Sequence, residues 1–143
     1  IELMTAGDYK SLIKQTKEGL SYKGPVIGLQ RERSDLYDRI NRRVEIMFEK
    51  GLVDEVKQLL KNGVNPNCQA FKGIGYKEVV QYLEGLISYD ACVDLIQKHT
   101  RHFAKRQITW YKRMPYIEWI TIDSQTTEAE IYGMACNIID SSF

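Results

Sequence analysis

Apolar residues recur along this chain at spacings that predict amphipathic helices separated by short turns. From Ser34 to about Lys50 they are three and four residues apart, which indicates one helix with Ser34 as its N-cap. A second such pattern follows Gly51 and ends at Gly63. The predicted buried stripes are Leu36, Ile40, Val44, Met47 and Phe48 in the first helix, and Leu52, Val53, Val56, Leu59 and Leu60 in the second.

Two apolar runs predict strands. Residues 25–29 are apolar throughout, which is typical of a strand buried in a parallel sheet, and residues 117–122 form the second run. Because most of the chain reads as helix, two strands alone do not make a sheet of ordinary size. We therefore expect an α/β fold in which the pair belongs to a larger sheet.

The later half of the sequence predicts three more helices. A Gly-x-Gly turn at residues 73–75 precedes a helix over residues 78–84. A long helix is expected from its N-cap Ser88 to Pro115, whose ring cannot continue a helix. Thr127 and Glu130 form a capping box for a final helix, whose predicted inward residues are Ile131, Met134, Ala135, Ile138 and Ile139.

Composition narrows the class of protein. The chain has 143 residues, 43% of them hydrophobic and 27% charged, which fits one globular domain with a core. No apolar run approaches the length of a membrane span, and no signal-peptide pattern opens the sequence. Its three cysteines are odd in number and far apart, which favours a reducing, cytoplasmic compartment. His99 and His102 are a weak zinc pattern, so no bound metal is predicted within this chain.

Positive charge is concentrated between residues 98 and 113. This stretch holds six lysines and arginines in sixteen residues and no acid, whereas the whole chain has a net charge of +1. On a helix its cations and His102 occupy one arc of about 140°. The opposite side carries Cys92, Ile96, His99, Phe103 and Trp110, which predicts a core face. A basic stripe interleaved with Ile108 and Thr109 indicates a nucleic-acid contact, and a solvated helix face is the alternative.

Arg43 differs from its neighbours in the predicted first helix. Arg39 follows Asp35 by four residues, and Arg42 follows Asp38 by four, so both have a local acidic partner. Arg43 has none and follows Arg39 instead. An arginine without an acid can hold phosphate through the fork of its guanidinium, although an ordinary surface arginine has the same surroundings.

The Gly-x-Gly turn is a second candidate phosphate contact. Lys72 and Lys77 flank Gly73 and Gly75, and the predicted helix that follows would present unpaired N–H groups at its start. The pattern is weak by itself, because Gly-x-Gly is common in turns. It is not the G-x-x-x-x-G-K-[ST] sequence of a phosphate-binding P-loop.

Taken in order, five blocks of this sequence strongly resemble the C-terminal part of tRNA dimethylallyltransferases, also called tRNA isopentenyltransferases. The resemblance covers roughly residues 25–123, with order and spacing kept. Its blocks are Leu36-Tyr37-x-Arg39-Ile40-x-x-Arg43-Val44-x-x-Met47, Gly51-Leu52-Val53-x-Glu55-Val56, Gly73-Ile74-Gly75-Tyr76-Lys77-Glu78, Tyr82-Leu83-Glu84-Gly85 and Thr100-Arg101-x-x-Ala104-Lys105-Arg106-Gln107-Ile108-Thr109-Trp110.

The resemblance implies a mostly helical C-terminal fragment of a P-loop-type, nucleoside triphosphate hydrolase-like parallel-sheet fold, to which the chain contributes two strands. Residues 1–24 would be the end of the family's helical insertion and a linker. Residues 25–143 would be the part of the catalytic domain that contacts tRNA and diphosphate. The implied reaction moves a dimethylallyl group from dimethylallyl diphosphate to N6 of the adenosine 3′ to the anticodon of tRNA.

The resemblance also implies roles for individual residues. Arg43 matches a family arginine that contacts the diphosphate of the donor. Two matched segments contact tRNA in the family: Lys72, Gly73, Ile74, Gly75, Tyr76 and Lys77, and then Lys105, Arg106, Gln107, Ile108, Thr109, Trp110, Tyr111 and Lys112. Trp110 and Tyr111 are open to a second reading, as core residues.

The family's phosphate loop and its catalytic Asp would lie upstream of Ile1, and the implied Mg²⁺ has no ligands in this chain. We therefore expect no catalytic residue among residues 1–143 and no transfer by this segment alone. The implied partners are the anticodon stem-loop of tRNA and dimethylallyl diphosphate, and the expected state is a monomer. The alternatives are a non-catalytic RNA-binding helical module and, less well supported, a nucleotide kinase fragment, which has no use for the helix around Lys105.

Overall fold

The computed structural model describes residues 24–142. The linker and short helix expected before residue 24 lie outside this part. The described elements, in order, are β1 (Val26–Arg31), α3 (Arg33–Glu49), α4 (Leu52–Lys61), a short 3-10 helix η1 (Gln69–Lys72), α5 (Tyr76–Leu83), α6 (Tyr89–Tyr111), β2 (Ile117–Ile122) and α7 (Glu128–Ser141).

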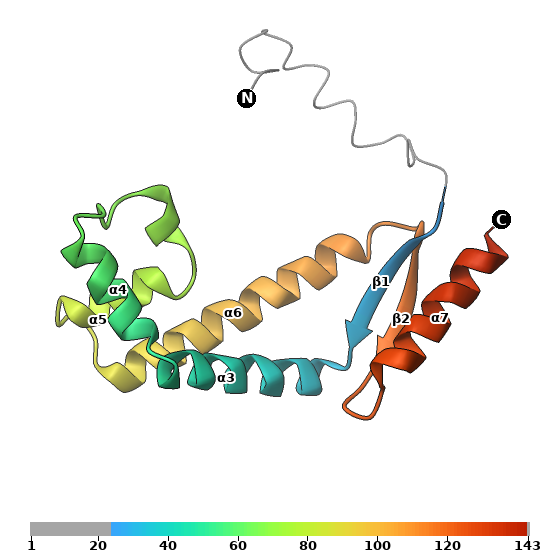
Figure 1. The fold of residues 1–143 in the computed structure, drawn as a ribbon, viewed down its shortest axis with the longest axis horizontal. Helices are drawn as coiled ribbons and strands as arrows, with labels where there is room; N and C mark the ends of the chain where they lie inside the picture. The colour runs from blue at the N-terminus through green and yellow to red at the C-terminus, as the bar shows by residue number, and fades with distance from the viewer. Residues whose placement is uncertain (1–23, 143) are drawn as a thin grey trace, which may run out of the picture.

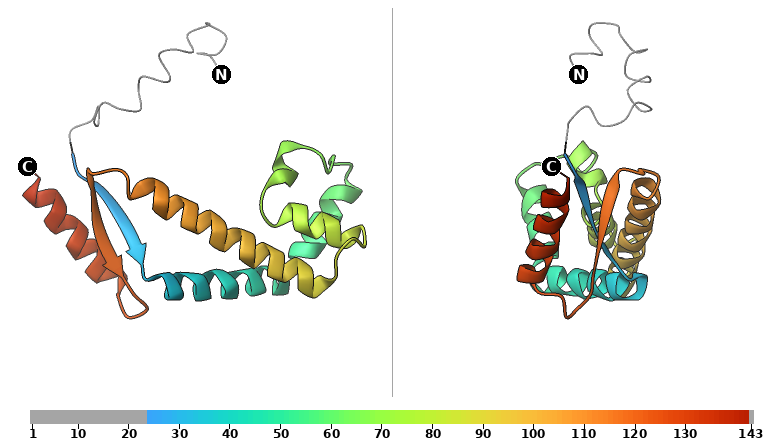
Figure 2. Two further views of the ribbon diagram at one scale, coloured as in Figure 1. Left: turned by 180° about the vertical axis from the view of Figure 1, so that it is seen from behind. Right: turned by 90° about the vertical axis from the view of Figure 1, so that its right-hand side faces the viewer.

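Two long helices connect a helical end of the molecule to the strands. Figure 1 shows α3 and α6 close together beside α4 and α5, and farther apart toward β1 and β2. Figure 2 places α6 and α7 on opposite sides of the strand pair. The start of α5 therefore lies at one end of the molecule, and the last turns of α6 lie at the other.

The strand prediction is confirmed, and the two strands pair with each other. β1 and β2 are parallel, with Val26 opposite Ile117 and Arg31 opposite Ile122. The expected full burial of the first strand is wrong in the described part of the chain, where β1 is half-buried and Leu29 is 54% exposed. A strand is buried on both faces only where further elements cover it.

Gly28 allows the two strands to pack closely around an aromatic ring. A Cβ built at this position would lie 2.7 Å from side-chain atoms of both Ile117 and Trp119. Such a distance is far below ordinary van der Waals contact, so the backbone of β1 requires a residue without a side chain here.

The core lies among the helices. Its buried residues are Val44, Phe48, Leu52, Val56, Phe71, Val79, Cys92 and Ile96. Of the stripe predicted for the first helix, Leu36 and Ile40 are only half-buried. They lie on the first turns of α3, toward the end where α3 and α6 diverge. In α7, none of the predicted inward residues is fully buried.

Helix ends follow the sequence signals with three corrections, of which the first is that α5 spans Tyr76–Leu83 and not residues 78–84. Ser88 caps α6, and Thr127 with Glu130 caps α7, as predicted. The N-cap of α3, however, is Glu32, whose carboxylate accepts from the backbone N–H of Ser34 at 2.6 Å. The long helix also ends earlier than Pro115, because Lys112 is already its C-cap.

Candidate nucleic-acid interface

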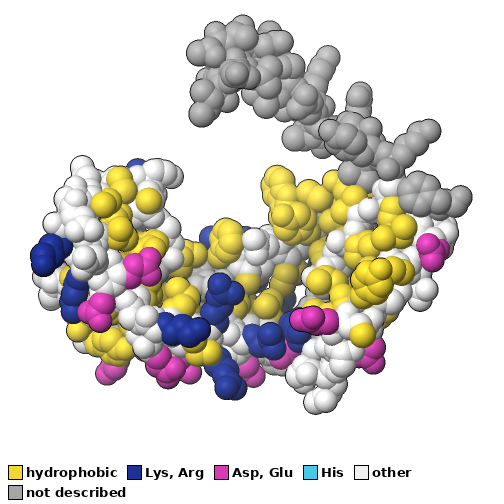
Figure 3. Space-filling view, in the orientation of Figure 1, with side chains coloured by type: hydrophobic (Ala, Val, Ile, Leu, Met, Phe, Trp, Pro, Cys, Tyr) yellow, Lys and Arg dark blue, Asp and Glu magenta, His cyan; other side chains and the backbone are white. Residues whose placement is uncertain are grey.

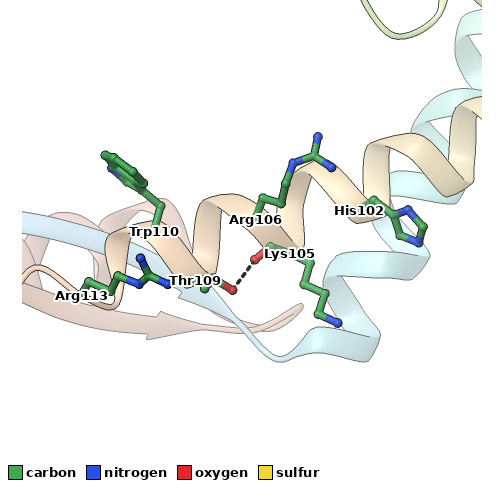
Figure 4. Close-up of a pocket in the computed structure, with 6 residues that line it drawn as sticks. All are labelled: His102, Lys105, Arg106, Thr109, Trp110 and Arg113. Atoms are coloured by element: carbon green, nitrogen blue, oxygen red, sulfur yellow. Dashed lines mark hydrogen bonds between the residues drawn. The ribbon is translucent and has the colours of Figure 1, made fainter.

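The last turns of α6 present cations and an exposed indole to solvent. Arg106 lies one turn before Trp110 on the same side of α6, and Arg113 follows the C-cap Lys112. Trp110 is 62% exposed and points away from the strands in Figure 4. These side chains line a depression of about 440 Å³, whose residues are His102, Lys105, Arg106, Thr109, Trp110 and Arg113. Cations beside an exposed aromatic side chain are suited to phosphates and unstacked bases.

The face of α6 that was predicted to be core is buried only in the first half of the helix. Cys92 and Ile96 are buried, but Phe103 is 46% exposed and Trp110 more so. The reason is that α3 and α6 diverge after the helical core, so α3 does not follow α6 along its later turns. The Arg106 guanidinium instead lies 5.7 Å from the centroid of the Phe103 ring, which is within cation–π range.

The predicted contact segment 105–112 is divided between two faces of α6. Gln107, Ile108, Tyr111 and Lys112 line a second cavity of about 620 Å³, between α6 and the carboxyl ends of the strands. Residues 105–111 are helical and turn through about 600°, so they do not share one surface. Lys105, Arg106, Thr109 and Trp110 are the four that the structure brings together.

One cation of the predicted stripe is already engaged. Arg101 is half-buried, and its guanidinium donates to the side-chain oxygen of Asn41 on α3 at 2.5 Å. Gln97 donates to the Asn41 backbone carbonyl at 3.3 Å. Both contacts join α6 to α3, so Arg101 serves helix packing and the basic surface starts one turn later.

The second predicted segment surrounds the start of α5. Lys72, Gly73, Ile74 and Lys77 are exposed, whereas Gly75 is buried. Tyr76 is half-buried, and its hydroxyl donates to Glu55 Oε1 at 2.5 Å. This hydrogen bond raises the pKa of Tyr76 above its ordinary value. The exposed lysines are available to an anion, while Tyr76 is committed to α4.

The N–H of Gly75 is not free for phosphate, contrary to the sequence prediction. It donates to Glu78 Oε2 at 2.8 Å. The other carboxylate oxygen, Oε1, lies 2.8 Å from His99 Nδ1 on α6. Burial and then the Glu78 charge raise the pKa of the nearby Cys92 to about 11. Sequence reasoning missed this pair, although Glu78 stands three residues after a glycine N-cap, the spacing of a capping box.

The arginines of α3 also differ from prediction. Asp35 pairs with Arg31 at 2.7 Å, and no ion pair joins Arg39 or Arg42 to an acid within residues 24–142. The lack of a partner therefore does not distinguish Arg43. All three arginines line one depression of about 510 Å³, together with Leu36, Ile40 and Ile46. Figure 3 shows lysine and arginine side chains gathered in this part of the surface.

The described residues offer few groups for other chemistry. Within residues 24–142, no three His, Cys, Asp or Glu side chains are grouped so that they could hold a metal ion. No helix in that range is long and apolar enough to cross a membrane.

Lysines and arginines clustered along a helix are the electrostatic footprint of a nucleic-acid contact. Comparison with known families makes the class specific. The family model described as "IPP transferase" matches residues 2–114, which is more than half of the sequence. The chain belongs to the IPP transferase family.

Curated relatives agree with this family. The chain is 42% identical over 132 residues to the tRNA dimethylallyltransferase of Alkaliphilus metalliredigens, covering 92% of this chain and 41% of the relative. It is 55% identical over 97 residues to the tRNA dimethylallyltransferase of Thermotoga neapolitana, covering 68% and 32% respectively. The chain thus spans less than half the length of these curated relatives.

Solved structures show the same arrangement. The full-length tRNA isopentenylpyrophosphate transferase of Bacillus halodurans matches with a TM-score of 0.74 and 34% identity, over 95% of this chain and 47% of that one. The Staphylococcus epidermidis tRNA isopentenylpyrophosphate transferase matches with a TM-score of 0.77 and 29% identity, over 99% and 46%. The mostly helical fold with two parallel strands is therefore the fold of part of these transferases.

Proposed function

We propose that this chain takes part in the transfer of a dimethylallyl group from dimethylallyl diphosphate to N6 of the adenosine 3′ to the anticodon of tRNA. Its strands would belong to a P-loop-type sheet. The observation that carries the proposal is the exposed surface of Lys105, Arg106 and Trp110 on α6, in a chain of the IPP transferase family. The relatives named tRNA dimethylallyltransferase support the choice of reaction.

The α6 surface would hold the RNA strand. Lys105, Arg106 and Arg113 would neutralise backbone phosphates, which releases bound counterions and makes binding depend on salt. Trp110 is exposed and would stack on a base that has left the helical stack. An adenosine whose N6 is to react must leave its stack, so a surface that holds the neighbouring nucleotides favours the reaction.

Arg43 would act on the donor. As N6 forms a bond to the allylic carbon, the carbon–oxygen bond to diphosphate breaks and the N6 proton is released. Negative charge develops on the departing diphosphate, and a guanidinium placed there lowers the barrier. Arg39 and Arg42 line the same depression and would contribute to the same positive potential. Leu36, Ile40 and Ile46 give that depression an apolar floor beside the cations.

The family resemblance also implies Mg²⁺, which would neutralise diphosphate charge during departure. The described residues do not provide a fitting donor set, because no three acidic, histidine or cysteine side chains are grouped there.

The proposal is tested by RNA binding at several salt concentrations. An anticodon stem-loop RNA is titrated with the protein, and affinity is followed by fluorescence anisotropy. Lys105→Ala is expected to weaken binding and to lower the slope of log affinity against log salt by about one. The matched control is Lys57→Ala on α4, which removes the same charge from a residue paired with Asp54. If the slope is unchanged in Lys105→Ala, the basic side of α6 is a solvated helix face and not an RNA contact.

A non-catalytic RNA-binding module is the second candidate. The observation that favours it is that Arg39 and Arg42 have no ion-pair partner within residues 24–142, so the lack of an acid does not mark Arg43 as a diphosphate ligand. The two candidates differ in donor binding by residues 1–143. Titration calorimetry with dimethylallyl diphosphate measures that binding, which the transferase part should show and the RNA-binding module should lack. Under both candidates we expect that this segment alone does not transfer the prenyl group, and mass spectrometry of incubated RNA checks this.

A further inference from the structure

Glu78 is a charged residue in a buried position. It is 4% exposed, and it is the one charged residue among residues 24–142 that is buried to this degree. Moving a carboxylate out of water costs several kcal/mol unless hydrogen bonds replace its hydration. Both of its oxygens are bonded, to different parts of the molecule. An apolar side chain of similar size would fill the space but could not make either bond.

The first bond fixes the backbone of the segment at residues 72–77. Glu78 Oε2 accepts from the N–H of Gly75 at 2.8 Å. Gly75 has φ +106° and ψ −61°, a conformation that residues with side chains rarely adopt. The carboxylate therefore holds the backbone in an unusual turn, with the exposed residues Ile74 and Lys77 on either side of it.

The second bond reaches α6. Glu78 Oε1 lies 2.8 Å from Nδ1 of His99, whose side chain is 43% exposed. Because a carboxylate only accepts, Nδ1 carries the proton in this contact. His99 precedes Lys105 by six residues on the same continuous helix. One buried side chain thus bonds both to the 72–77 turn and to the helix that carries the basic surface.

We propose that Glu78 is a positioning residue that holds the 72–77 segment in a fixed relation to α6, so that Lys72 and Lys77 meet the same RNA as the Lys105–Trp110 surface. The inference rests on the proposed RNA contact and adds to it the residue that aligns the two contacting segments. Glu78 and His99 act through the backbone they hold and do not themselves contact RNA in this arrangement.

The alignment is tested by a double-mutant cycle in RNA affinity. Glu78→Ala is expected to weaken stem-loop binding by roughly tenfold, the scale of a lost charge-assisted hydrogen bond. The pair Lys72→Ala and Lys77→Ala should weaken it as well. If Glu78 acts by presenting these lysines, adding Glu78→Ala to that pair causes little further loss. If the fold losses in affinity of Glu78→Ala and of the lysine pair multiply, the inference is overturned. Glu78 would then affect RNA binding independently of Lys72 and Lys77.

A buried control separates positioning from general stability. Val79→Ala alters the neighbouring, fully buried residue of α5 and leaves both Glu78 bonds in place. It should lower the free energy of unfolding without changing RNA affinity where the protein remains folded. If Val79→Ala weakens binding as much as Glu78→Ala does, the effect of Glu78 is only structural and the inference fails. Glu78→Met fills a similar volume but can make neither bond, and it serves if Glu78→Ala does not fold.

The link to α6 is tested at His99. An Asn amide nitrogen occupies nearly the position of Nδ1, so His99→Asn can still donate to Glu78 and should bind RNA like the unaltered protein. His99→Leu cannot donate and should lose affinity as Glu78→Ala does. Normal affinity in His99→Leu would overturn the link between the two segments.

A readout without RNA distinguishes this inference from the proposed function. Hydrogen exchange of the Gly75 amide should accelerate in Glu78→Ala, while amides of the helical core keep their protection. If the unaltered chain binds no RNA, the proposed function fails, and Gly75 exchange still decides whether Glu78 fixes the turn. Unchanged Gly75 exchange in Glu78→Ala, together with normal RNA binding, would overturn the positioning role alone.

Discussion

At the scale of single residues, Trp110 has a large apolar surface in contact with water on the last turn of α6. Arg106 lies one turn earlier on the helix, Arg113 lies just past the helix end, and all three line the same depression. Because the indole is exposed, the free energy that burial of its apolar surface would contribute is not gained. A base stacked on the ring would recover it, with the arginines placed for the adjoining phosphates.

Trp110→Ala is therefore expected to weaken binding of a single-stranded or stem-loop RNA by about 1–3 kcal/mol, the usual value of one stacked base. The salt slope should stay the same, because no charge is removed. Anisotropy titrations measure both quantities. Tyr132→Ala on α7 is the matched control, since it also removes an exposed aromatic ring. Equal effects of the two substitutions would contradict a stacking role for Trp110.

Arg43 permits a second prediction at this scale. Arg43→Ala should weaken binding of inorganic pyrophosphate by roughly tenfold, because a charge-assisted contact contributes about 1.5–3 kcal/mol. Isothermal titration calorimetry measures the affinity directly. Arg33→Ala is the control, because Arg33 is an exposed arginine of the same helix that lines a different cavity.

Comparison with Arg39→Ala and Arg42→Ala decides how the depression works. A loss confined to Arg43 supports one specific ligand of diphosphate. Equal losses at all three arginines would mean that the depression attracts anions through its summed charge, and the particular role of Arg43 would be refuted.

At the scale of elements, some boundaries could be read from the sequence because short-range chemistry fixes them. The strand at residues 117–122 and the caps Ser88 and Thr127 depend on neighbouring residues alone, and the structure has them as predicted. Glu32 was missed as the cap of α3, since a carboxylate two residues farther back competes with Ser34. The Glu78 bond to His99 joins two helices, so no local pattern reveals it.

The paired strands give a prediction about close packing. Gly28→Ala would place a Cβ 2.7 Å from the ring of Trp119, so β1 and β2 must move apart or the indole must shift. We expect a destabilisation of about 1–3 kcal/mol, the usual cost of overpacking, measured by urea unfolding. Gly133→Ala in α7 is the matched control. Nothing lies within 4 Å of the added atom there, and alanine favours the helix. If both substitutions stabilise the protein, the close contact in β1 is refuted.

At the scale of the whole molecule, the buried residues fall into two groups. The cluster that includes Val56, Val79 and Ile96 lies among the helices, whereas Ile120 and Ile122 are buried in β2 outside it. The helical periodicity of the sequence predicted most members of the first group, but not Phe71 or Val79. The periodicity could not predict at which turn α6 stops packing against α3, because that depends on the divergence of α3 and α6 toward the strands. Phe103 and Trp110 follow the core period but lie beyond that point.

Two groups of buried residues imply two levels of local stability, because amides open with the cooperative unit that buries them. Ile96→Ala should lower the free energy of global unfolding by about 2–5 kcal/mol, as expected for a cavity in a packed core. Native-state hydrogen exchange should show this loss throughout the most protected amides of α3 to α6. Ile120→Ala removes the same atoms from β2, and it should deprotect β1, β2 and α7 while the helical amides keep their exchange rates. If Ile120→Ala lowered protection in the helices by the same amount, the molecule would unfold as one unit. The basic end of α6 would then owe its order to the strands as much as to the helical core.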